Sequence, residues 1–173
     1  MTASTPKALD VSFTRRDLRD ALGMFATGVT VVTTRGAKEP YGMTASAFSV
    51  VSFDPPLVLV CVVSQAQGAE SIAANRHFAV NVLTAEQEAL SRHFASRKRR
   101  RGPDAFAEIP HREAVTGAPI LDGVAAYLDC WLAAKHEAGD HVIFVGEVLA
   151  LGADRSAPPL LYFAGSYRSF PPC

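Results

Sequence analysis

The sequence predicts a mainly β protein, a barrel or sandwich with a few helices at its periphery. About six segments are rich in β-branched residues or alternate apolar with polar residues, which is typical of strands. Most of the connections between them are short, which favours antiparallel neighbours. Only brief stretches show the apolar period of a helix. These observations together favour a β-barrel or β-sandwich decorated with helices.

The first expected element is a helix that begins after Ser12 or Thr14, since either side chain can cap a helix N-terminus. Its apolar residues fall at positions i, i+3, i+4 and i+7: Leu18, Ala21, Leu22 and Phe25. Gly28 is expected to end it, because glycine is common just beyond helix C-termini. Shorter helices are predicted at residues 69–75 and 86–95.

The strands are predicted from β-branched runs and from period-two alternation, and one of them, residues 41–52, is expected to be long or bent. They are residues 29–34, 41–52, 57–63, 77–83, 124–137, 141–151 and 159–167. The uniformly apolar segment 57–63 is expected to be buried on both faces. Gly139 and Asp140 form a hairpin signal between two of the strands.

Composition indicates an ordinary globular domain. Lys plus Arg and Asp plus Glu both number 17 in 173 residues, so no net charge favours nucleic acid or an anionic membrane as a partner. No apolar segment approaches the length of a membrane span. Residues 1–12 are expected to be a flexible N-terminal segment, and residues 13–170 a single domain.

The cysteines indicate a reducing compartment. Cys61, Cys130 and Cys173 form no CxxC motif and cannot all pair with one another. Cys61 and Cys130 lie in apolar runs and are expected to be reduced core residues. The N-terminus also lacks the basic and apolar regions of a signal peptide. A cytoplasmic location is therefore expected.

The common catalytic signatures are missing. The sequence has no GxGxxG after a strand, no GxxxxGK[ST], no HExxH and no GxSxG. No metal ion is expected, because the five histidines lack the spacing of a ligand set, and His136 and His141 would have no third partner. The basic run at residues 97–101, RKRRR, lacks interleaved aromatic residues and is interpreted as a solvated loop; contact with a cofactor phosphate is the alternative.

The segment PYGMTASAFSVVSFDPP, residues 40–56, is apolar yet rich in small and hydroxylated residues. Residues two apart share a face of a strand, so Gly42, Thr44 and Ser46 are expected on one face, and Met43 and Ala45 on the other. Such a face gives a flat ligand access to backbone and hydroxyl groups. A crowded barrel interior or a bulge would also explain small residues here. The pattern itself leaves both explanations open.

Five segments in series resemble the flavin reductase-like, FMN-binding split-barrel family. They are ALGMFATGVTVVTT, GMTASAFSVVSFDPPLVLVCV, FAVNVL, GDHVIFVGEV and PLLYFAGSY, and the resemblance runs from about Phe13 to Tyr167. More narrowly, the chain is similar to the short-chain reductase component of two-component flavin-dependent monooxygenases. The resemblance implies a homodimer of six-stranded antiparallel Greek-key split barrels with a few peripheral helices and with the flavin at the subunit interface.

The resemblance also implies which residues contact the flavin. They come from the small-residue strand, from the strand and loop that follow it, and from two helices: Gly42, Met43, Thr44, Ala45, Ser46, Ala47, Cys61, Val62, Val63, Gln67, Gly68, Ser71 and Phe94. The helix N-terminus near Ala69 is also a physically favourable place for a phosphate. Family members often carry a hydroxyl residue at the position of Gly68, which puts the phosphate contacts of this chain in question.

The nicotinamide nucleotide is implied to dock at His141 and at the last strand, with Tyr162, Phe163 and Ala164. A turn histidine exposed to solvent is the simpler explanation of His141. Family members often have an arginine at the position of Ala164, so these contacts are also in question. No catalytic acid or base is expected, because hydride transfer depends on how the cofactors are positioned.

The resemblance implies an NAD(P)H:flavin oxidoreductase that supplies reduced flavin to a separate monooxygenase. The sequence does not distinguish FMN from FAD, or NADH from NADPH, and does not identify the partner's substrate. Two alternatives stay open: an enzyme like pyridoxamine-phosphate oxidase, which shares the split barrel, and a non-catalytic flavin- or haem-binding module.

Overall fold

The computed structural model describes residues 12–37 and 39–170. Its helices are α1 (Arg15–Gly23), α2 (Gln67–Asn75) and α3 (Glu88–Ala95), with 3₁₀ turns η1 (Ala85–Gln87) and η2 (Gly102–Phe106). The strands are β1 (Thr27–Gly28), β2 (Thr30–Arg35), β3 (Pro40–Ala45), β4 (Phe48–Phe53), β5 (Pro56–Val63), β6 (His77–Val82), β7 (His111–Glu113), β8 (Pro119–Leu121), β9 (Ala126–Ala138), β10 (His141–Ala153), β11 (Leu161–Phe163) and β12 (Ser166–Arg168). The predicted mainly β class is confirmed, whereas the predicted flexible segment 1–12 lies outside the described residues except for Ser12.

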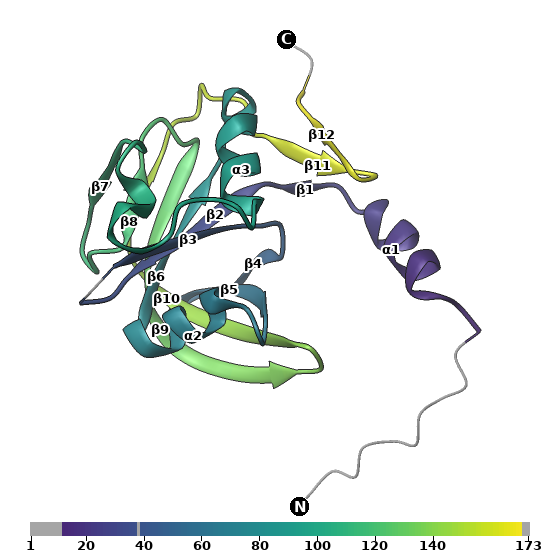
Figure 1. Ribbon diagram of the computed structural model, residues 1–173, viewed down its shortest axis with the longest axis horizontal. Helices are drawn as coiled ribbons and strands as arrows, with labels where there is room; N and C mark the ends of the chain where they lie inside the picture. Colours follow the sequence, from purple (N-terminus) through teal and green to yellow (C-terminus); the bar gives the residue numbers. More distant parts are fainter. Residues whose placement is uncertain (1–11, 38, 171–173) are drawn as a thin grey trace, which may run out of the picture.

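One antiparallel sheet forms the body of the molecule, and it curls strongly (Figure 1). Its strand order is β3-β2-β6-β9-β10-β5-β4, which makes seven strands where the family resemblance implied a six-stranded barrel. The two edge strands, β3 and β4, follow one another in the chain and are joined only by Ser46 and Ala47. No ladder among the described residues pairs them, so hydrogen bonds do not close the sheet into a barrel.

The expected bent strand at residues 41–52 is confirmed as two strands with a break at Ser46 and Ala47. The hairpin predicted at Gly139 and Asp140 is also confirmed, because it joins the two longest strands, β9 and β10. The prediction that residues 57–63 are buried on both faces is wrong. Burial alternates along β5, so that only the face of Val58, Val60 and Val62 lies in the core.

Two main clusters of buried side chains surround the sheet. The first lies under α2 and includes Val60, Phe78 and Phe144, all with no exposed surface. The second lies under α3 and η2 and includes Val31, Leu83 and Phe94. Both faces of β2 are therefore buried, since Val31 belongs to one cluster and Val32 to the other.

Helix α1 lies apart from this body (Figure 1). It begins with a capping box, in which Thr14 accepts from the backbone N–H of Asp17 and the Asp17 carboxylate accepts from that of Thr14. It ends at Gly23 rather than at the predicted Gly28, because Thr27 and Gly28 pair as β1 with β11. Every residue of this described helix keeps exposed or half-exposed surface.

Candidate functional site

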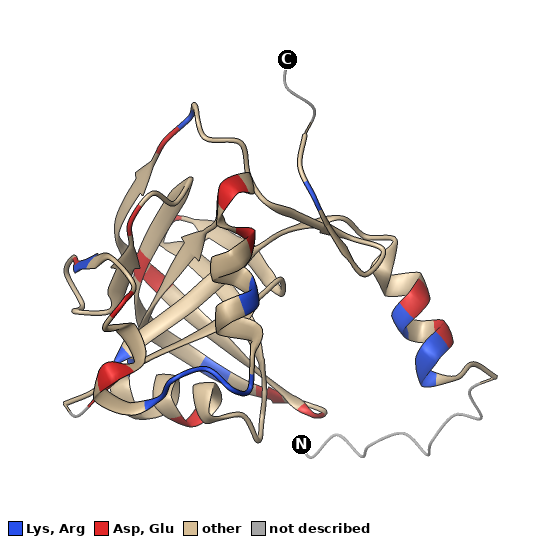
Figure 2. Cartoon of the chain, turned by 45° about the horizontal axis from the view of Figure 1, so that its top comes forward, with Lys and Arg blue, Asp and Glu red and all other residues tan. Residues whose placement is uncertain are grey.

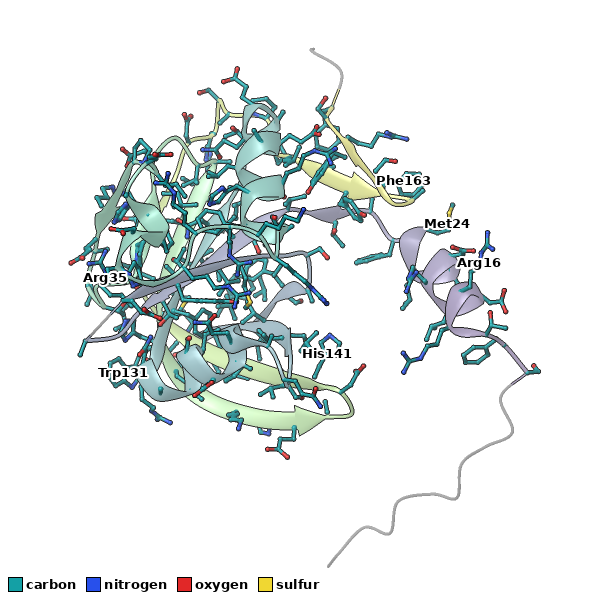
Figure 3. All side chains as sticks on the ribbon, in the orientation of Figure 1. Arg16, Met24, Arg35, Trp131, His141 and Phe163 are labelled. Atoms are coloured by element: carbon teal, nitrogen blue, oxygen red, sulfur yellow. The ribbon has the colours of Figure 1, made fainter. Side chains whose placement is uncertain are left out.

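A large cavity of the described structure lies between α1 and the break that joins β3 to β4 (Figure 3). Its volume is about 900 Å³, within the range of small-molecule and cofactor sites. Small and apolar residues dominate its lining, with three charged side chains among them: Arg15, Leu18, Arg19, Leu22, Gly23, Phe25, Thr27, Ser46, Ala47, Phe48, Ser49, Leu59, Cys61, Asp140 and Tyr162.

The break between β3 and β4 supplies hydrogen-bond donors to this cavity. The Ala47 carbonyl accepts from Cys61 N and the Ser46 carbonyl accepts from Phe48 N, both at 3.0 Å, so the backbone is fixed here. Within the described residues, the backbone N–H groups of Ser46 and Ala47 and the Ser46 hydroxyl donate to no protein acceptor. They therefore remain available to a ligand, and Ser46 adds little bulk above the strand.

Strand β5 forms a second wall of the cavity. Because Val58, Val60 and Val62 point into the core, Leu59 and Cys61 point to the opposite face and line the cavity. Cys61 is thus half-buried at the site and not the core residue that the sequence predicted. Cys130 is buried as predicted, and burial together with the charge of Asp129 raises the pKa of its thiol to about 12.

A smaller cavity of about 210 Å³ adjoins the first, since Ser46 and Tyr162 line both. It lies among β3, the end of α3 and the β11–β12 hairpin, with Thr44, Ala45 and Tyr167 in its walls. The Tyr162 and Tyr167 rings meet edge to face at 5.4 Å between centroids, and the Tyr167 hydroxyl is 2.9 Å from the Ser91 hydroxyl. The ring contact lies within the β11–β12 hairpin, and the hydrogen bond between Tyr167 and Ser91 holds the hairpin against α3.

The predicted common face of Gly42, Thr44 and Ser46 needs a correction. A Cβ atom at Gly42 would lie 2.5 Å from Phe94 Cε1 and 3.0 Å from Phe106 Cζ, so the missing side chain makes room for core packing and not for a flat ligand. The Thr44 hydroxyl donates to the Ser91 carbonyl at 2.6 Å, so it already has a protein acceptor. Of the three, Ser46 alone lines the large cavity.

His141 begins β10 at the edge of the body that faces α1 (Figure 3). Its Nδ1 lies 2.7 Å from Asp140 Oδ1, and Asp140 lines the large cavity. The hydrogen bond with His141, then the charges of His141 and Arg15, hold the pKa of Asp140 below its usual range. Asp140 thereby fixes one ring nitrogen of His141 and leaves Nε2 for a ligand.

Other predicted site residues lie away from the large cavity. Met43 packs against the first core cluster, Val62 is buried in it, and Val63 is exposed at the end of β5. Gln67, Gly42 and Phe94 line a narrow hollow beside the basic loop, Gly68 is buried at the start of α2, and Ser71 lines a separate cavity of about 590 Å³. Ala164 has φ 48° and donates its N–H to Gly23 O at 2.9 Å, and Phe163 points away from the body (Figure 3).

The sequence did not single out the contribution of α1. Arg15, Leu18, Arg19 and Leu22 turn one face of the helix toward the cavity. The apolar period at Leu18, Leu22 and Phe25 predicted a buried face but gave no sign of what would cover it. Leu59 and Phe48 were also missed, because they look like ordinary core residues of a strand.

Metal chemistry has no basis in the described part of the chain. No group of three or more His, Cys, Asp or Glu side chains there could hold an ion. In the β9–β10 ladder, His136 pairs with Ile143 and His141 pairs with Ala138, so the two histidines are not cross-strand partners. None of the helices in residues 12–37 and 39–170 is long and apolar enough to cross a membrane.

A comparison with known families matches residues 22–171 to the model described as "Flavin reductase like domain". The chain belongs to the flavin reductase-like family. The match covers the body of the molecule, the donors at Ser46 and Ala47, and the hairpin that carries Tyr162, so the family resemblance seen in the sequence is confirmed.

Relatives in this flavin reductase-like family have named activities. The NADH-dependent FAD reductase of Streptomyces globisporus is 43% identical over 159 residues, which cover 91% of this chain and 87% of that protein. Reductase subunit HsaB of a flavin-dependent monooxygenase from Mycobacterium tuberculosis is 38% identical over 159 residues, covering 91% and 83%. The crystal structure of BorF, the flavin reductase component of a bacterial two-component tryptophan halogenase, superposes with a TM-score of 0.87 at 40% identity, covering 92% of this chain and all of that one.

The large cavity fits the flavin that this family name implies. A flavin ring needs a broad apolar surface together with hydrogen-bond donors at its polar edge. The cavity offers Leu59, Phe48 and Tyr162 as apolar surface, and the unpaired groups of Ser46 and Ala47 as donors. Its volume of about 900 Å³ also leaves room for a second planar ring.

Proposed function

We propose that this protein is an NAD(P)H-dependent flavin reductase that uses FMN or FAD and releases the reduced flavin to a separate monooxygenase. One observation carries the proposal: the large cavity is lined by small residues and free donors, in a chain that matches the flavin reductase-like family over residues 22–171. When bound, the flavin supplies an acceptor for the hydride of the nicotinamide.

The residues of the chain would act by positioning. Ser46 and Ala47 would hold the flavin through their backbone N–H groups, and Cys61 and Leu59 would add apolar surface for its ring. Within the described residues, no side chain in the cavity is arranged as a general acid or base with a partner except the Asp140–His141 pair. This lining agrees with a reaction that needs close, parallel rings and excluded water more than proton transfer.

We assign the nicotinamide nucleotide to the side of the cavity formed by His141 and the β11 strand. Asp140 contacts His141 Nδ1 and so leaves Nε2 for the nucleotide, and Tyr162 lines both cavities. Phe163 and Ala164, at the turn of the β11–β12 hairpin, also belong to the predicted contacts, although of this strand and turn only Tyr162 lines the two cavities. The positive φ of Ala164 turns the chain tightly enough for its N–H to bond Gly23 at the end of α1.

A homodimer is part of this proposal, with the curled sheet serving as the split barrel of the family. Apolar side chains on α1 and just after it are exposed, Leu22 by 65% and Phe25 by 77%, and Phe53 on β4 is exposed by 91%. Surfaces of this kind favour a protein partner. A second copy at this place would also cover the open side of the large cavity, so that flavin would bind between two subunits.

The partner monooxygenase follows from the named relatives and from the openness of the site. HsaB is a reductase subunit of a flavin-dependent monooxygenase, and BorF is the reductase component of a halogenase. In this proposal the reduced flavin reaches the partner by diffusion, so the flavin behaves as a substrate. Moderate flavin affinity is therefore expected.

The experiment is a steady-state matrix of NADH and NADPH against FMN, FAD and riboflavin, with nicotinamide oxidation followed in air. Acceleration with at least one flavin over the flavin-free rate is expected. A protein that accelerates none of the six combinations would contradict the proposal. A yellow protein that NADH cannot bleach under nitrogen would favour the oxidase-like or non-catalytic alternatives instead.

A further inference from the structure

The basic loop, residues 97–101, carries five consecutive cationic side chains that the proposed hydride transfer does not use. It joins α3 to η2 and runs past the start of α2, and Figure 2 shows it as a continuous blue segment. Arg100 pairs with Glu108 at 3.1 Å. Among the described residues, Arg97, Lys98, Arg99 and Arg101 have no carboxylate within 4.0 Å. The loop therefore holds a concentration of uncompensated positive charge.

Arg99 is the one side chain of the basic loop that is held in place by several contacts. Its guanidinium donates to Ser96 O at 2.7 Å and to the Tyr41 hydroxyl at 3.0 Å, and it lies 5.3 Å from the centroid of the Tyr41 ring. Neutral partners leave the full charge of the group, and two of its five N–H donors are used. Arg99 thus offers a fixed, charged donor group at the surface.

The position of Arg99 is coupled to the absence of a side chain at Gly68. A Cβ atom at Gly68 would lie 2.5 Å from Met43 Sδ and 3.0 Å from Tyr41 Cε1. Tyr41 therefore packs directly on the first turn of α2. Because Arg99 contacts the Tyr41 hydroxyl and ring, Arg99 is also held near this end of the helix. A hydroxyl side chain at position 68 would be too large for this packing. The Arg99 guanidinium lies beside the same end of α2.

This arrangement lies at the right place for one end of the proposed flavin. Strand β3 runs from Tyr41 beside the basic loop to Ala45, and Ser46 at the large cavity follows. Five residues of strand span about 16 Å. A flavin with its extended ribityl chain and the reach of an arginine can cover that distance. The hollow between Arg99 and Gln67 holds only about 10 Å³, so an anion would lie at its mouth.

We propose that the basic loop binds the phosphate group of the flavin substrate, with Arg99 as its principal contact. This inference rests on the proposed reductase function and adds that the enzyme selects phosphorylated flavins over riboflavin. Arginine suits a phosphate because its planar fork donates two parallel hydrogen bonds. Glu39 lines both the hollow beside Arg99 and the neighbouring cavity that Glu70 lines, and at the hollow its one carboxylate is outnumbered by Arg99, Arg100 and Arg101.

The test compares two full-length variants that each remove one positive charge. Arg99→Gln removes the proposed contact and keeps most of the side chain's length. Arg155→Gln is the matched control, because Arg155 is exposed in the turn after β10. Dissociation constants of the oxidised flavins are measured by fluorescence titration without nucleotide, and Michaelis constants with NADH, in each case for FMN, FAD and riboflavin. We expect Arg99→Gln to raise KM for FMN and FAD on the order of tenfold, as for loss of a charge-assisted hydrogen bond, with riboflavin unchanged.

A second variant covers the case in which Arg99→Gln disturbs Tyr41. Arg97→Gln with Arg101→Gln alters only exposed side chains of the basic loop, and a smaller rise in KM for FMN is expected. Added salt should raise KM for FMN in the unaltered enzyme and leave that for riboflavin constant. If the basic loop had only a structural role, these changes would alter KM equally for FMN, FAD and riboflavin.

Several results would overturn the inference. They are an equal rise in KM for riboflavin, or a change in KM for NADH with the flavin kinetics unaffected. If the unaltered protein reduces all three flavins and Arg99→Gln changes none of them, the inference fails while the reductase function stands. If the unaltered protein reduces no flavin, the proposed function itself is wrong.

Discussion

Small residues on β3 and just after it serve two different purposes. Gly42 has no side chain because Phe94 and Phe106 occupy the space, whereas Ser46 is small at the wall of the large cavity. The two positions look alike in the sequence. They differ only in what distant parts of the chain bring against them.

Substitution of Gly42 tests the packing role. Gly42→Ala would place Cβ 2.5 Å from a ring atom of Phe94, and such overpacking typically costs about 1–3 kcal/mol. We expect a lower free energy of unfolding by urea denaturation. Gly28→Ala is the control, because a Cβ there meets no atom within 4 Å. Equal stability of both variants would show that the Phe94 ring moves aside without penalty.

Substitution of Ser46 tests the ligand role. Ser46→Phe fills the cavity beside the free donors, so we expect loss of flavin turnover with the melting temperature kept near that of the unaltered protein. Ser46→Ala keeps the space and removes only the hydroxyl, and a modest rise in KM for flavin is expected. Normal turnover by Ser46→Phe would place the flavin elsewhere.

The Asp140–His141 pair gives a pH-dependent prediction. Because the pKa of Asp140 is depressed, the hydrogen bond is intact above the ordinary pKa of aspartate and is lost as pH falls through the depressed value. His141→Ala should raise KM for NADH and leave flavin affinity unchanged. Asp140→Asn should raise KM for NADH less than His141→Ala does, and it should alter the acidic limb of the pH profile of NADH oxidation. Unchanged NADH kinetics in both variants would make His141 an ordinary exposed turn residue.

At the scale of elements, much of the fold could be predicted from short sequence signals at helix starts and turns. Ser12 or Thr14 was expected to cap α1, and Thr14 does; Gly139 with Asp140 marked the β9–β10 hairpin, because caps and tight turns depend on a few adjacent residues. Ser46 lies at the break between two strands and lines the large cavity, and its contact with the flavin stays a prediction.

The parts that sequence reasoning missed depend on contacts between distant residues. Gly42 was assigned to a ligand because nothing near it in the sequence indicates Phe94 and Phe106. Thr44 was thought to have a free hydroxyl for the same reason, since its acceptor is a carbonyl of α3. The short strands β7 and β8 carry no strong alternation and were not predicted. The family resemblance supplied the flavin, which the residue pattern left open.

For the whole molecule, the isolated position of α1 needs an explanation. A helix of nine residues is marginal in water without tertiary packing, even with a capping box. Its contact with the rest of the described chain includes one backbone hydrogen bond, from Ala164 N to Gly23 O. Leu18, Leu22 and Phe25 would therefore be unfavourably exposed in a monomer. A second copy that packs against this face would stabilise the helix and close the cavity at once.

The last prediction tests this dimer. Leu18→Glu with Leu22→Glu places two carboxylates on the apolar face of α1, so we expect a shift from dimer to monomer, measured by size-exclusion chromatography with light scattering. Arg16→Gln with Arg19→Gln is the control for charge, since it changes net charge by the same amount and keeps the leucines; because Arg19 also lines the cavity, only its oligomeric state is compared. The oligomeric state is also the only readout for the leucine variant, because Leu18 and Leu22 line the cavity as well. A leucine variant that stays dimeric, or an unaltered protein that is monomeric and fully active, would rule out α1 as the contact.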